Sequence, residues 1–194
     1  WGHYLGKMHR LGAEYTPASP EIRRPNWHEI EAFDVLERIP EEQTAIHEKC
    51  KPRLAKIRAI TENNILLHAD PEPWNVLLHD NTLGWIDFDE CCYFHPAFDI
   101  AVSMMNILIA AVNDALNPDN VEKNEKAQRI WSQLYQAYKE EYTLSEEELA
   151  LIPDFLHYRV MQSYAHNYIA FDFDNLLDWQ EYVHTYFHRI IMNN

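Results

Sequence analysis

The strongest constraint on the fold of this chain is a change of apolar spacing near residue 64. Elsewhere apolar residues recur every three or four positions, whereas residues 65–67, 74–78 and 83–88 form three short apolar runs. A turn-forming segment at 80–84 separates the last two runs. This pattern predicts a small β-hairpin inserted among helices. The expected fold class is therefore mainly α with a small β-hairpin insert, an α+β fold.

Helical spacing covers most of the remaining sequence. An opening helix has Leu5, Met8 and Leu11 on one face, and a further acidic helix is expected to begin near Pro40. No second domain boundary is evident, so residues 1–194 are expected to form a single helical lobe. The other expected helices span residues 27–36, 52–61, 96–115, 121–141, 145–169 and 175–192.

Polar residues stand at the ends of the short apolar runs. Asp70 comes soon after the first run, Asn75 follows five positions later, and Asp87 lies twelve positions beyond Asn75. Phosphoryl transfer from a nucleotide requires a carboxylate facing the acceptor hydroxyl, and oxygen ligands that hold Mg²⁺ on the phosphates. An isolated Asp in a turn is more often a hydrogen-bond acceptor for the backbone. The order, spacing and context of the three residues together favour the catalytic interpretation.

The pattern His68-x-Asp70-x₄-Asn75, followed by Asp87-Phe88-Asp89, resembles the catalytic and metal-binding loops of the aminoglycoside phosphotransferase and choline kinase group. These enzymes are relatives of the protein kinases, and the resemblance covers nearly the entire chain as the C-terminal lobe of such a protein. It implies an ATP-dependent phosphotransferase that uses Mg²⁺ and acts on a hydroxyl of a small, amine-bearing molecule.

The resemblance also implies a role for each matching residue. Asp70 takes the catalytic position, and Asn75 and Asp87 take the metal-ligand positions. Asp89 is expected near the metal as an auxiliary group, and His68 is expected to orient the loop through hydrogen bonds. Asp99, within a segment that resembles the one following the metal loop, is expected to be a structural brace. Leu5-Gly6-Lys7-Met8-His9-Arg10 resembles a helix that the family carries upstream, including the position of its histidine.

The chain departs from the family pattern in two ways. Ala69 replaces the commoner glycine, and Pro71-Glu72-Pro73-Trp74 replaces a more typical run within the catalytic loop. In addition, no segment resembles the family's N-terminal nucleotide-binding β-lobe, and the four glycines lie too far apart for a phosphate-cradling loop. We therefore expect this chain to be a lobe cut from something longer, and a poor or inactive enzyme on its own.

Candidate acceptor-binding residues lie late in the chain, where aromatic and acidic side chains gather. Aromatic faces and carboxylates suit an ammonium group, which fits an aminoglycoside, an amino alcohol or a hydroxy amino acid. Aromatic residues at helical spacing are also typical of a core, and at least half of this cluster is expected to be core. The residues that we select as acceptor-binding are Tyr168, Asp172, Asp174 and Trp179.

Composition limits the classes of partner. The net charge of −15 argues against a nucleic-acid-binding surface, which needs clustered Lys and Arg. Three cysteines, two of them adjacent, do not form a disulfide framework, and no stretch of 18 apolar residues predicts a membrane span. We therefore expect a cytoplasmic protein that binds a nucleotide and a small molecule, without nucleic acid or membrane.

Two other functional classes compete with the kinase hypothesis. A non-catalytic, kinase-like binding or regulatory module is one, and the joint presence of Asp70, Asn75 and Asp87 argues against it. A metal-dependent hydrolase that uses the 11 histidines is the other, but no H-E-x-x-H or H-x-H pair occurs. The identity of the acceptor and the oligomeric state remain open at this stage.

Overall fold

The computed structural model describes residues 1–80, 82–114 and 121–193. The chain divides into two compact units, each made of two sequence segments. The prediction of a single lobe over residues 1–194 stays a prediction. Unit 1 consists of Trp1–Trp27 and Thr61–Leu156, and unit 2 consists of His28–Ile60 and His157–Asn194.

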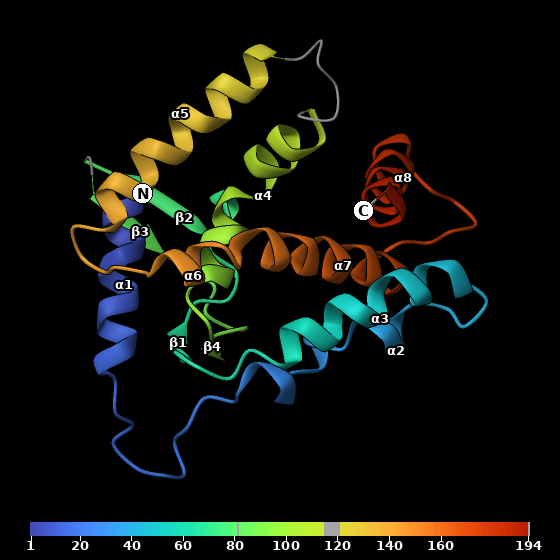
Figure 1. The fold of residues 1–194 in the computed structure, drawn as a ribbon. Coiled ribbons are helices and arrows are strands. Elements are labelled where there is room, and N and C mark those ends of the chain that lie inside the picture. Colours follow the sequence, from blue (N-terminus) through green and yellow to red (C-terminus); the bar gives the residue numbers. More distant parts are fainter. Residues whose placement is uncertain (81, 115–120, 194) are drawn as a thin grey trace. The chain divides into compact units, whose positions relative to one another are not determined.

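Unit 1 combines helices with two small antiparallel sheets (Figure 1). Strand β1 pairs with β4, with Leu66 opposite Tyr93, and β2 pairs with β3 as a hairpin, with Val76 opposite Trp85. The expected hairpin is therefore confirmed, although the sequence did not predict β4. The elements of unit 1 are α1 (Gly2–Glu14), β1 (Ile65–Leu67), η3 (Pro73–Asn75), β2 (Val76–His79), β3 (Thr82–Trp85), β4 (Cys92–Phe94), α4 (Ala97–Asp114), α5 (Val121–Tyr138) and α6 (Glu146–Leu149).

Helix α1 lies beside α5 and β1 because glycines allow a close approach (Figure 1). A Cβ on Gly6 would lie 2.5 Å from the backbone oxygen of Tyr138, and a Cβ on Gly2 would clash with the backbone oxygen of Leu134. A Cβ on Gly12 would clash in the same way with the backbone oxygen of Leu66 in β1. Three of the four glycines thus serve helix packing rather than a phosphate-binding loop.

The core of unit 1 contains a cluster of aromatic rings. Phe94 of β4 stacks on Trp27 at a centroid distance of 4.7 Å, and it also contacts Phe98 and Phe155. All four side chains are buried. Phe94 is the last residue of β4 and lies three residues before α4 begins at Ala97. Its packing in this cluster therefore fixes the β1–β4 sheet to the core.

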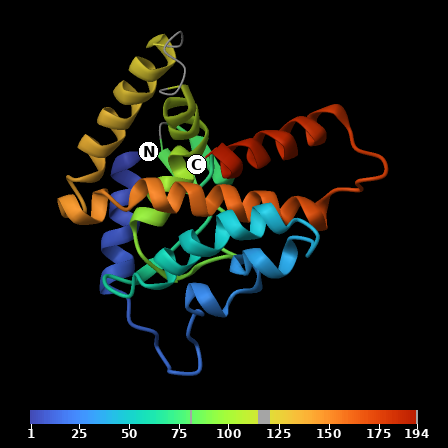
Figure 2. The same ribbon diagram turned by 45° about the vertical axis from the view of Figure 1, so that its right-hand side comes forward.

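Unit 2 is helical (Figure 2). Helix α3 packs against α8, and the buried Tyr158 hydroxyl donates a hydrogen bond of 3.0 Å to the backbone oxygen of Phe33. Helix α7 begins in unit 1 and continues in unit 2. Two elements cross the boundary between the units, η1 (Trp27–Glu29) and α7 (Ile152–Ala170). The elements wholly within unit 2 are η2 (Glu31–Phe33), α2 (Val35–Arg38), α3 (Thr44–Arg58) and α8 (Asp178–Asn193).

Three helix predictions were wrong in their extent. The helices expected at 52–61 and from near Pro40 are one helix, α3, which begins at Thr44, contains Pro52 in its interior and ends at Arg58.

The expected helix at 27–36 is broken into two 3₁₀ turns and a short helix, because Ile30 has an extended backbone and the Phe33 carbonyl bonds to a tyrosine hydroxyl instead. The expected helix at 145–169 is two helices, since Pro153 starts a new helix in its first turn. No helix among the described residues is long and apolar enough to cross a membrane.

Candidate functional site

The centre of the candidate site is a short loop that begins after β1. Asn75 donates hydrogen bonds from its amide nitrogen to the Asp70 carboxylate at 2.8 Å and to the Asp70 backbone oxygen at 3.0 Å. Further bonds fix the intervening backbone: the Glu72 N–H donates to the Asp70 carbonyl, and the Ser103 hydroxyl donates to the Pro71 carbonyl. The Asp70 side chain is therefore held by its own loop in one position.

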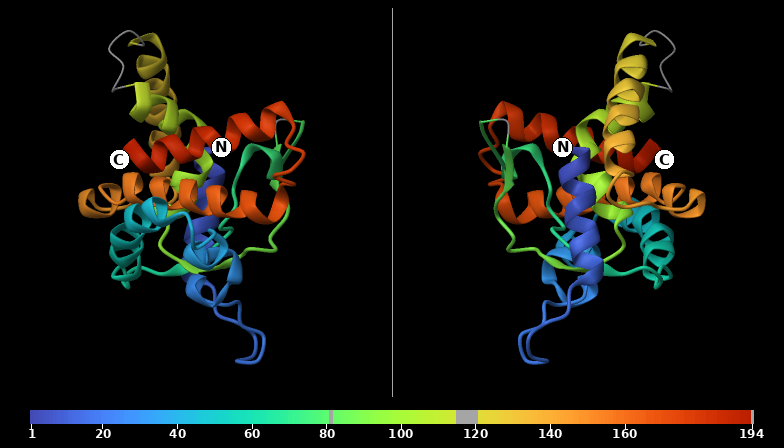
Figure 3. Two further views of the ribbon diagram at one scale, coloured as in Figure 1. Left: turned by 90° about the vertical axis from the view of Figure 1, so that its right-hand side faces the viewer. Right: turned by 90° about the vertical axis from the view of Figure 1, so that its left-hand side faces the viewer.

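The β2–β3 hairpin, drawn in green in Figure 3, returns the chain to this loop at Ile86, one residue before Asp87. Asn75 directly precedes β2 and Ile86 directly follows β3, and the Ile86 N–H donates a 3.0 Å hydrogen bond to the Asn75 carbonyl. Asp87 comes one residue later, is exposed, and has a φ of 63°. A non-glycine residue in this left-handed region stores strain, which is typical of functional positions.

His68 links the two loops. Its Nε2 donates to the Ile86 carbonyl at 2.9 Å, and its Nδ1 accepts from the Asp70 N–H at 3.3 Å, so the hydrogen bonds select one neutral tautomer. The buried ring also packs on Phe88 at a centroid distance of 4.3 Å. Because both ring nitrogens contact the backbone, the geometry suits loop orientation better than proton transfer.

Asp99, on the first turn of α4, holds the backbone that precedes Asp70. Its carboxylate accepts from the Ala69 N–H at 2.9 Å and from the His68 N–H at 3.1 Å. The same carboxylate accepts from His9 Nε2 at 3.2 Å, and His9 Nδ1 contacts the Tyr138 hydroxyl at 2.8 Å. All these groups are buried. Burial raises the pKa of Tyr138, so this hydroxyl stays protonated.

Oxygen atoms of Asn75 and Asp87 fit a hard divalent cation. The Asn75 nitrogen is committed to Asp70, which leaves its amide oxygen as the group able to bind a metal. Mg²⁺ needs few protein ligands when phosphates and water complete its octahedron. In the described part of the chain, no three His, Cys, Asp or Glu side chains gather as a metal cluster. An amide oxygen and a carboxylate, with phosphate oxygens and water completing the octahedron, therefore fit a hard divalent cation.

Asp89 lies in the exposed turn that follows Asp87. The turn is closed by the Cys91 N–H, which donates to the Phe88 carbonyl, and by Arg24, which donates to the same carbonyl at 2.8 Å. These bonds fix the backbone around Asp89. Its auxiliary role near a metal stays a prediction.

The four acceptor candidates all lie in unit 2, around the turn between α7 and α8. Asp172 accepts from Asn175 Nδ2 and from the Asp174 N–H, and the Asn175 hydrogen bond is the main reason for its lowered pKa. Tyr168 stacks on Phe173 and bonds to another tyrosine, whereas Trp179 is exposed. Asp172 is thus committed to its own turn, and the acceptor-binding role of all four residues stays a prediction.

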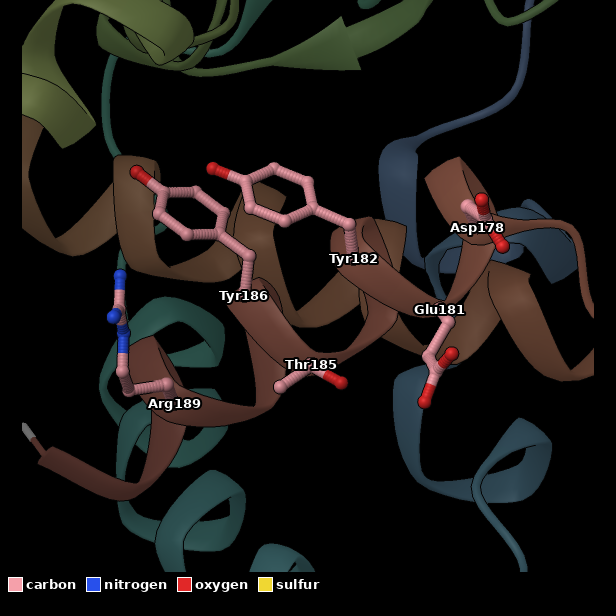
Figure 4. Close-up of a pocket in the computed structure, with 6 residues that line it drawn as sticks. All are labelled: Asp178, Glu181, Tyr182, Thr185, Tyr186 and Arg189. Atoms are coloured by element: carbon pink, nitrogen blue, oxygen red, sulfur yellow. The ribbon is translucent and has the colours of Figure 1, made fainter.

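A surface pocket of about 380 Å³ lies along α8 (Figure 4). The rings of Tyr182 and Tyr186 are nearly parallel, and the Arg189 guanidinium lies 5.4 Å from the centroid of the Tyr186 ring. Figure 4 shows the carboxylates at the opposite end from Arg189. The described residues that line the pocket are Asp178, Glu181, Tyr182, Thr185, Tyr186 and Arg189.

Comparison with known proteins places the chain in a family. A family model described as "Phosphotransferase enzyme family" matches residues 1–140, which include Asp70, Asn75, Asp87 and Asp99. The chain belongs to the phosphotransferase enzyme family. The resemblance inferred from the loop residues is therefore confirmed at the level of the family.

Relatives of this phosphotransferase-family chain include small-molecule kinases. Amicoumacin kinase of Bacillus subtilis (strain 168) is 27% identical over 198 residues, which cover 99% of this chain and 56% of the relative. A solved structure, amicoumacin kinase hAmiN in complex with AMP-PNP, Ca²⁺ and Ami, has a TM-score of 0.84 and 28% identity over 99% of this chain and 57% of that chain. The phosphotransferase-family chain thus spans a little over half the length of these relatives.

A more distant structure shares the fold. The microcompartment-associated aminopropanol kinase matches with a TM-score of 0.60 and 16% identity, covering 98% of this chain and 59% of that chain. Together with the hAmiN structure, this likeness confirms the kinase-like α+β fold of the phosphotransferase-family chain.

The structure also reveals residues that sequence analysis of this phosphotransferase-family chain did not select. His9 was noticed only as part of a helix, yet it lies in contact with Asp99. Tyr138 was not selected at all, because 129 residues separate it from His9. The α8 pocket did leave a sequence signal, since its residues recur at helical spacing from Asp178 to Arg189.

Proposed function

We propose that the protein transfers the γ-phosphate of ATP to a hydroxyl of a small, amine-bearing molecule, with Mg²⁺ as the divalent cation. The observation that supports this most directly is the 2.8 Å hydrogen bond between Asn75 and Asp70, in a loop to which the hairpin returns the chain at Ile86, one residue before Asp87. AMP-PNP and Ca²⁺ occur in the complex of the similar hAmiN kinase, which supports a nucleotide and a divalent cation.

In this proposal Asp70 orients the acceptor hydroxyl and accepts its proton. Phosphoryl transfer passes through a loose transition state, so the base chiefly positions the hydroxyl and takes the proton late. The two bonds from Asn75 keep the carboxylate in one orientation, which preserves the alignment of the reacting atoms. Asp89 is assigned an auxiliary role near the metal.

The metal, when bound, neutralises charge on the phosphates. Asn75 Oδ1 and the Asp87 carboxylate are the atoms of this chain that would hold it. The exposed position of Asp87 and the commitment of the Asn75 nitrogen to Asp70 support this assignment.

For the acceptor, we extend the proposed binding residues from Tyr168, Asp172, Asp174 and Trp179 to the α8 pocket. An ammonium group would bind near Asp178 and Glu181, against the face of Tyr182, whose side chain is 70% exposed. The acidic residues also suit the first turn of a helix, which is a purely structural explanation. Measurements of acceptor binding distinguish an ammonium-binding role of these carboxylates from a purely structural one.

The test is ATP consumption by the gene product that contains residues 1–194, assayed with Mg²⁺ against amino alcohols, hydroxy amino acids and aminoglycosides. Acceptor-dependent turnover should fall by about 10²- to 10⁴-fold in Asp70→Ala. Glu62→Ala, which removes an exposed carboxylate eight residues before Asp70 and outside the catalytic loop, should retain turnover. The 194-residue chain alone should show little or no turnover.

The acceptor site is tested separately by the same assay. Glu181→Gln should raise KM for an amine-bearing acceptor, whereas Glu147→Gln, an exposed residue of α6, should not. If no acceptor supports turnover and no Mg²⁺-dependent nucleotide binding occurs, the protein is instead a non-catalytic, kinase-like binding or regulatory module.

A further inference from the structure

A buried chain of hydrogen bonds connects three helices of unit 1 to the catalytic loop. It runs from the Tyr138 hydroxyl of α5 to His9 of α1, and from His9 to the Asp99 carboxylate of α4. Both ring nitrogens of His9 are used, at 2.8 and 3.2 Å, and the side chains of His9 and Asp99 have no exposed surface. Because both nitrogens of the His9 imidazole are hydrogen-bonded, the ring has one orientation. It therefore also fixes the orientation of the Asp99 carboxylate.

Asp99 transmits this orientation to the backbone just before Asp70. Its two oxygens accept from the N–H groups of His68 and Ala69, and Ala69 has a φ of 69°. An alanine in the left-handed region persists only where its surroundings hold it there. The two hydrogen bonds that the Asp99 carboxylate accepts help to hold this backbone.

Burial makes the third contact of Asp99 important. A carboxylate removed from water needs several hydrogen-bond donors, and His9 supplies the side-chain donor among the three. Without His9, Asp99 would turn toward other donors or admit water. Either change would loosen its hold on His68 and Ala69.

We propose that His9 is a positioning residue for Asp70, acting through Asp99 and assisted by Tyr138. This inference rests on the proposed function, in which Asp70 is the base. Small displacements of a catalytic group reduce the rate of the chemical step more than they reduce binding of distant parts of a substrate. His9 therefore affects kcat more than KM for the nucleotide.

The first measurement is amide hydrogen exchange at residues 68–70 in the 194-residue chain, which does not depend on enzymatic activity. His9→Gln should accelerate exchange at these residues by at least about tenfold, because the loosened Asp99 carboxylate protects their N–H groups less well. Tyr138→Phe should have a smaller effect in the same direction. His3→Gln serves as the matched control, because His3 lies on the same helix with an exposed side chain.

A second control separates positioning from a general loss of packing. Leu5→Ala removes a fully buried side chain of α1 that is not part of the hydrogen-bond chain, so it should lower global stability. The exchange rates of residues 68–70 and of the β1–β4 sheet should then rise by the same factor, and their ratio should stay unchanged. If His9→Gln and Leu5→Ala give the same exchange pattern, the inference is wrong.

The kinetic test uses the gene product once turnover has been found. His9→Gln should lower kcat by about tenfold or more with KM for ATP within about twofold of wild type. The double variant His9→Gln/Tyr138→Phe should be no worse than His9→Gln, because both residues act through one chain of contacts. If His9→Gln accelerates exchange of the loop but the gene product shows no turnover with any acceptor, the positioning role stands and the proposed function is wrong. If the gene product shows turnover but His9→Gln leaves loop exchange unchanged, the proposed function stands and the positioning role is wrong.

Discussion

The Asn75 side-chain amide donates to both the carboxylate and the backbone carbonyl of Asp70, at 2.8 and 3.0 Å. The nitrogen of Asn75 thus fixes both the side chain and the backbone of the proposed base. Its amide oxygen remains suited to binding a cation. The hairpin that starts at Val76 returns the chain to Ile86, whose N–H bonds to the Asn75 carbonyl. Under the proposed function, base orientation and metal binding are therefore coupled through Asn75.

This coupling predicts the effect of removing the Asn75 amide. Asn75→Ala should lower the affinity for Mg²⁺ and also lower kcat at saturating Mg²⁺, each by about 10- to 100-fold, because a ligand and the clamp on Asp70 are lost together. The measurement is turnover of the gene product as a function of Mg²⁺ concentration. Full recovery of kcat at high Mg²⁺ would show that the clamp has no catalytic role.

Ala69 allows a test of backbone strain in the loop. Ala69→Val should destabilise the chain by about 3 kcal/mol, because a β-branched side chain is poorly tolerated at a φ of 69° and the site is fully buried. Ala69→Gly relieves strain but loses a buried methyl group and raises the entropy of the unfolded chain, so it should change stability by less than about 1 kcal/mol. Urea denaturation of both variants measures the difference.

Close packing of α1 against α5 gives a third prediction. Gly6→Ala should destabilise the protein by about 1–3 kcal/mol, since the new Cβ would lie 2.5 Å from the Tyr138 carbonyl oxygen. Gly84→Ala is the control: nothing lies within 4 Å of its Cβ, and alanine should be neutral or stabilising by about 0.5–1 kcal/mol in a strand. In thermal unfolding, the midpoint of Gly6→Ala should therefore fall, whereas that of Gly84→Ala should rise or stay unchanged.

Apart from Asp99, which the family resemblance supplied, the parts of this site that sequence reasoning predicted are local in the chain. Asp70 and Asn75 are five residues apart, and a short hairpin connects Asn75 to Asp87, so spacing and turn residues were enough to group them. The contact of His9 with Asp99 spans 90 residues and depends on helix packing, which spacing does not reveal. The helix expected at 27–36 failed for a related reason, because the hydroxyl that binds the Phe33 carbonyl lies 125 residues away.

Histidines that are wholly or partly removed from water give a prediction about pH. Burial lowers the pKa of His95, which lies two residues before α4 and accepts a hydrogen bond from the Ala97 N–H at 3.2 Å. Partial desolvation also lowers the pKa of His184, which is half-buried, and of His166, although much of that residue is exposed. Since each native pKa is below that of an unfolded histidine, the unfolded state binds protons first as the pH falls.

Stability should accordingly be greatest above about pH 6.5, the ordinary histidine pKa, and should decrease as the pH falls below it. One buried histidine contributes at most about 1.4 kcal/mol of this loss at pH 5.5. His95→Asn keeps a side-chain acceptor for the Ala97 N–H and removes the titrating group, so its urea midpoint should decrease less between pH 7.5 and 5.5 than that of the wild type. An identical decrease in both proteins would show that His95 does not contribute to the acid sensitivity.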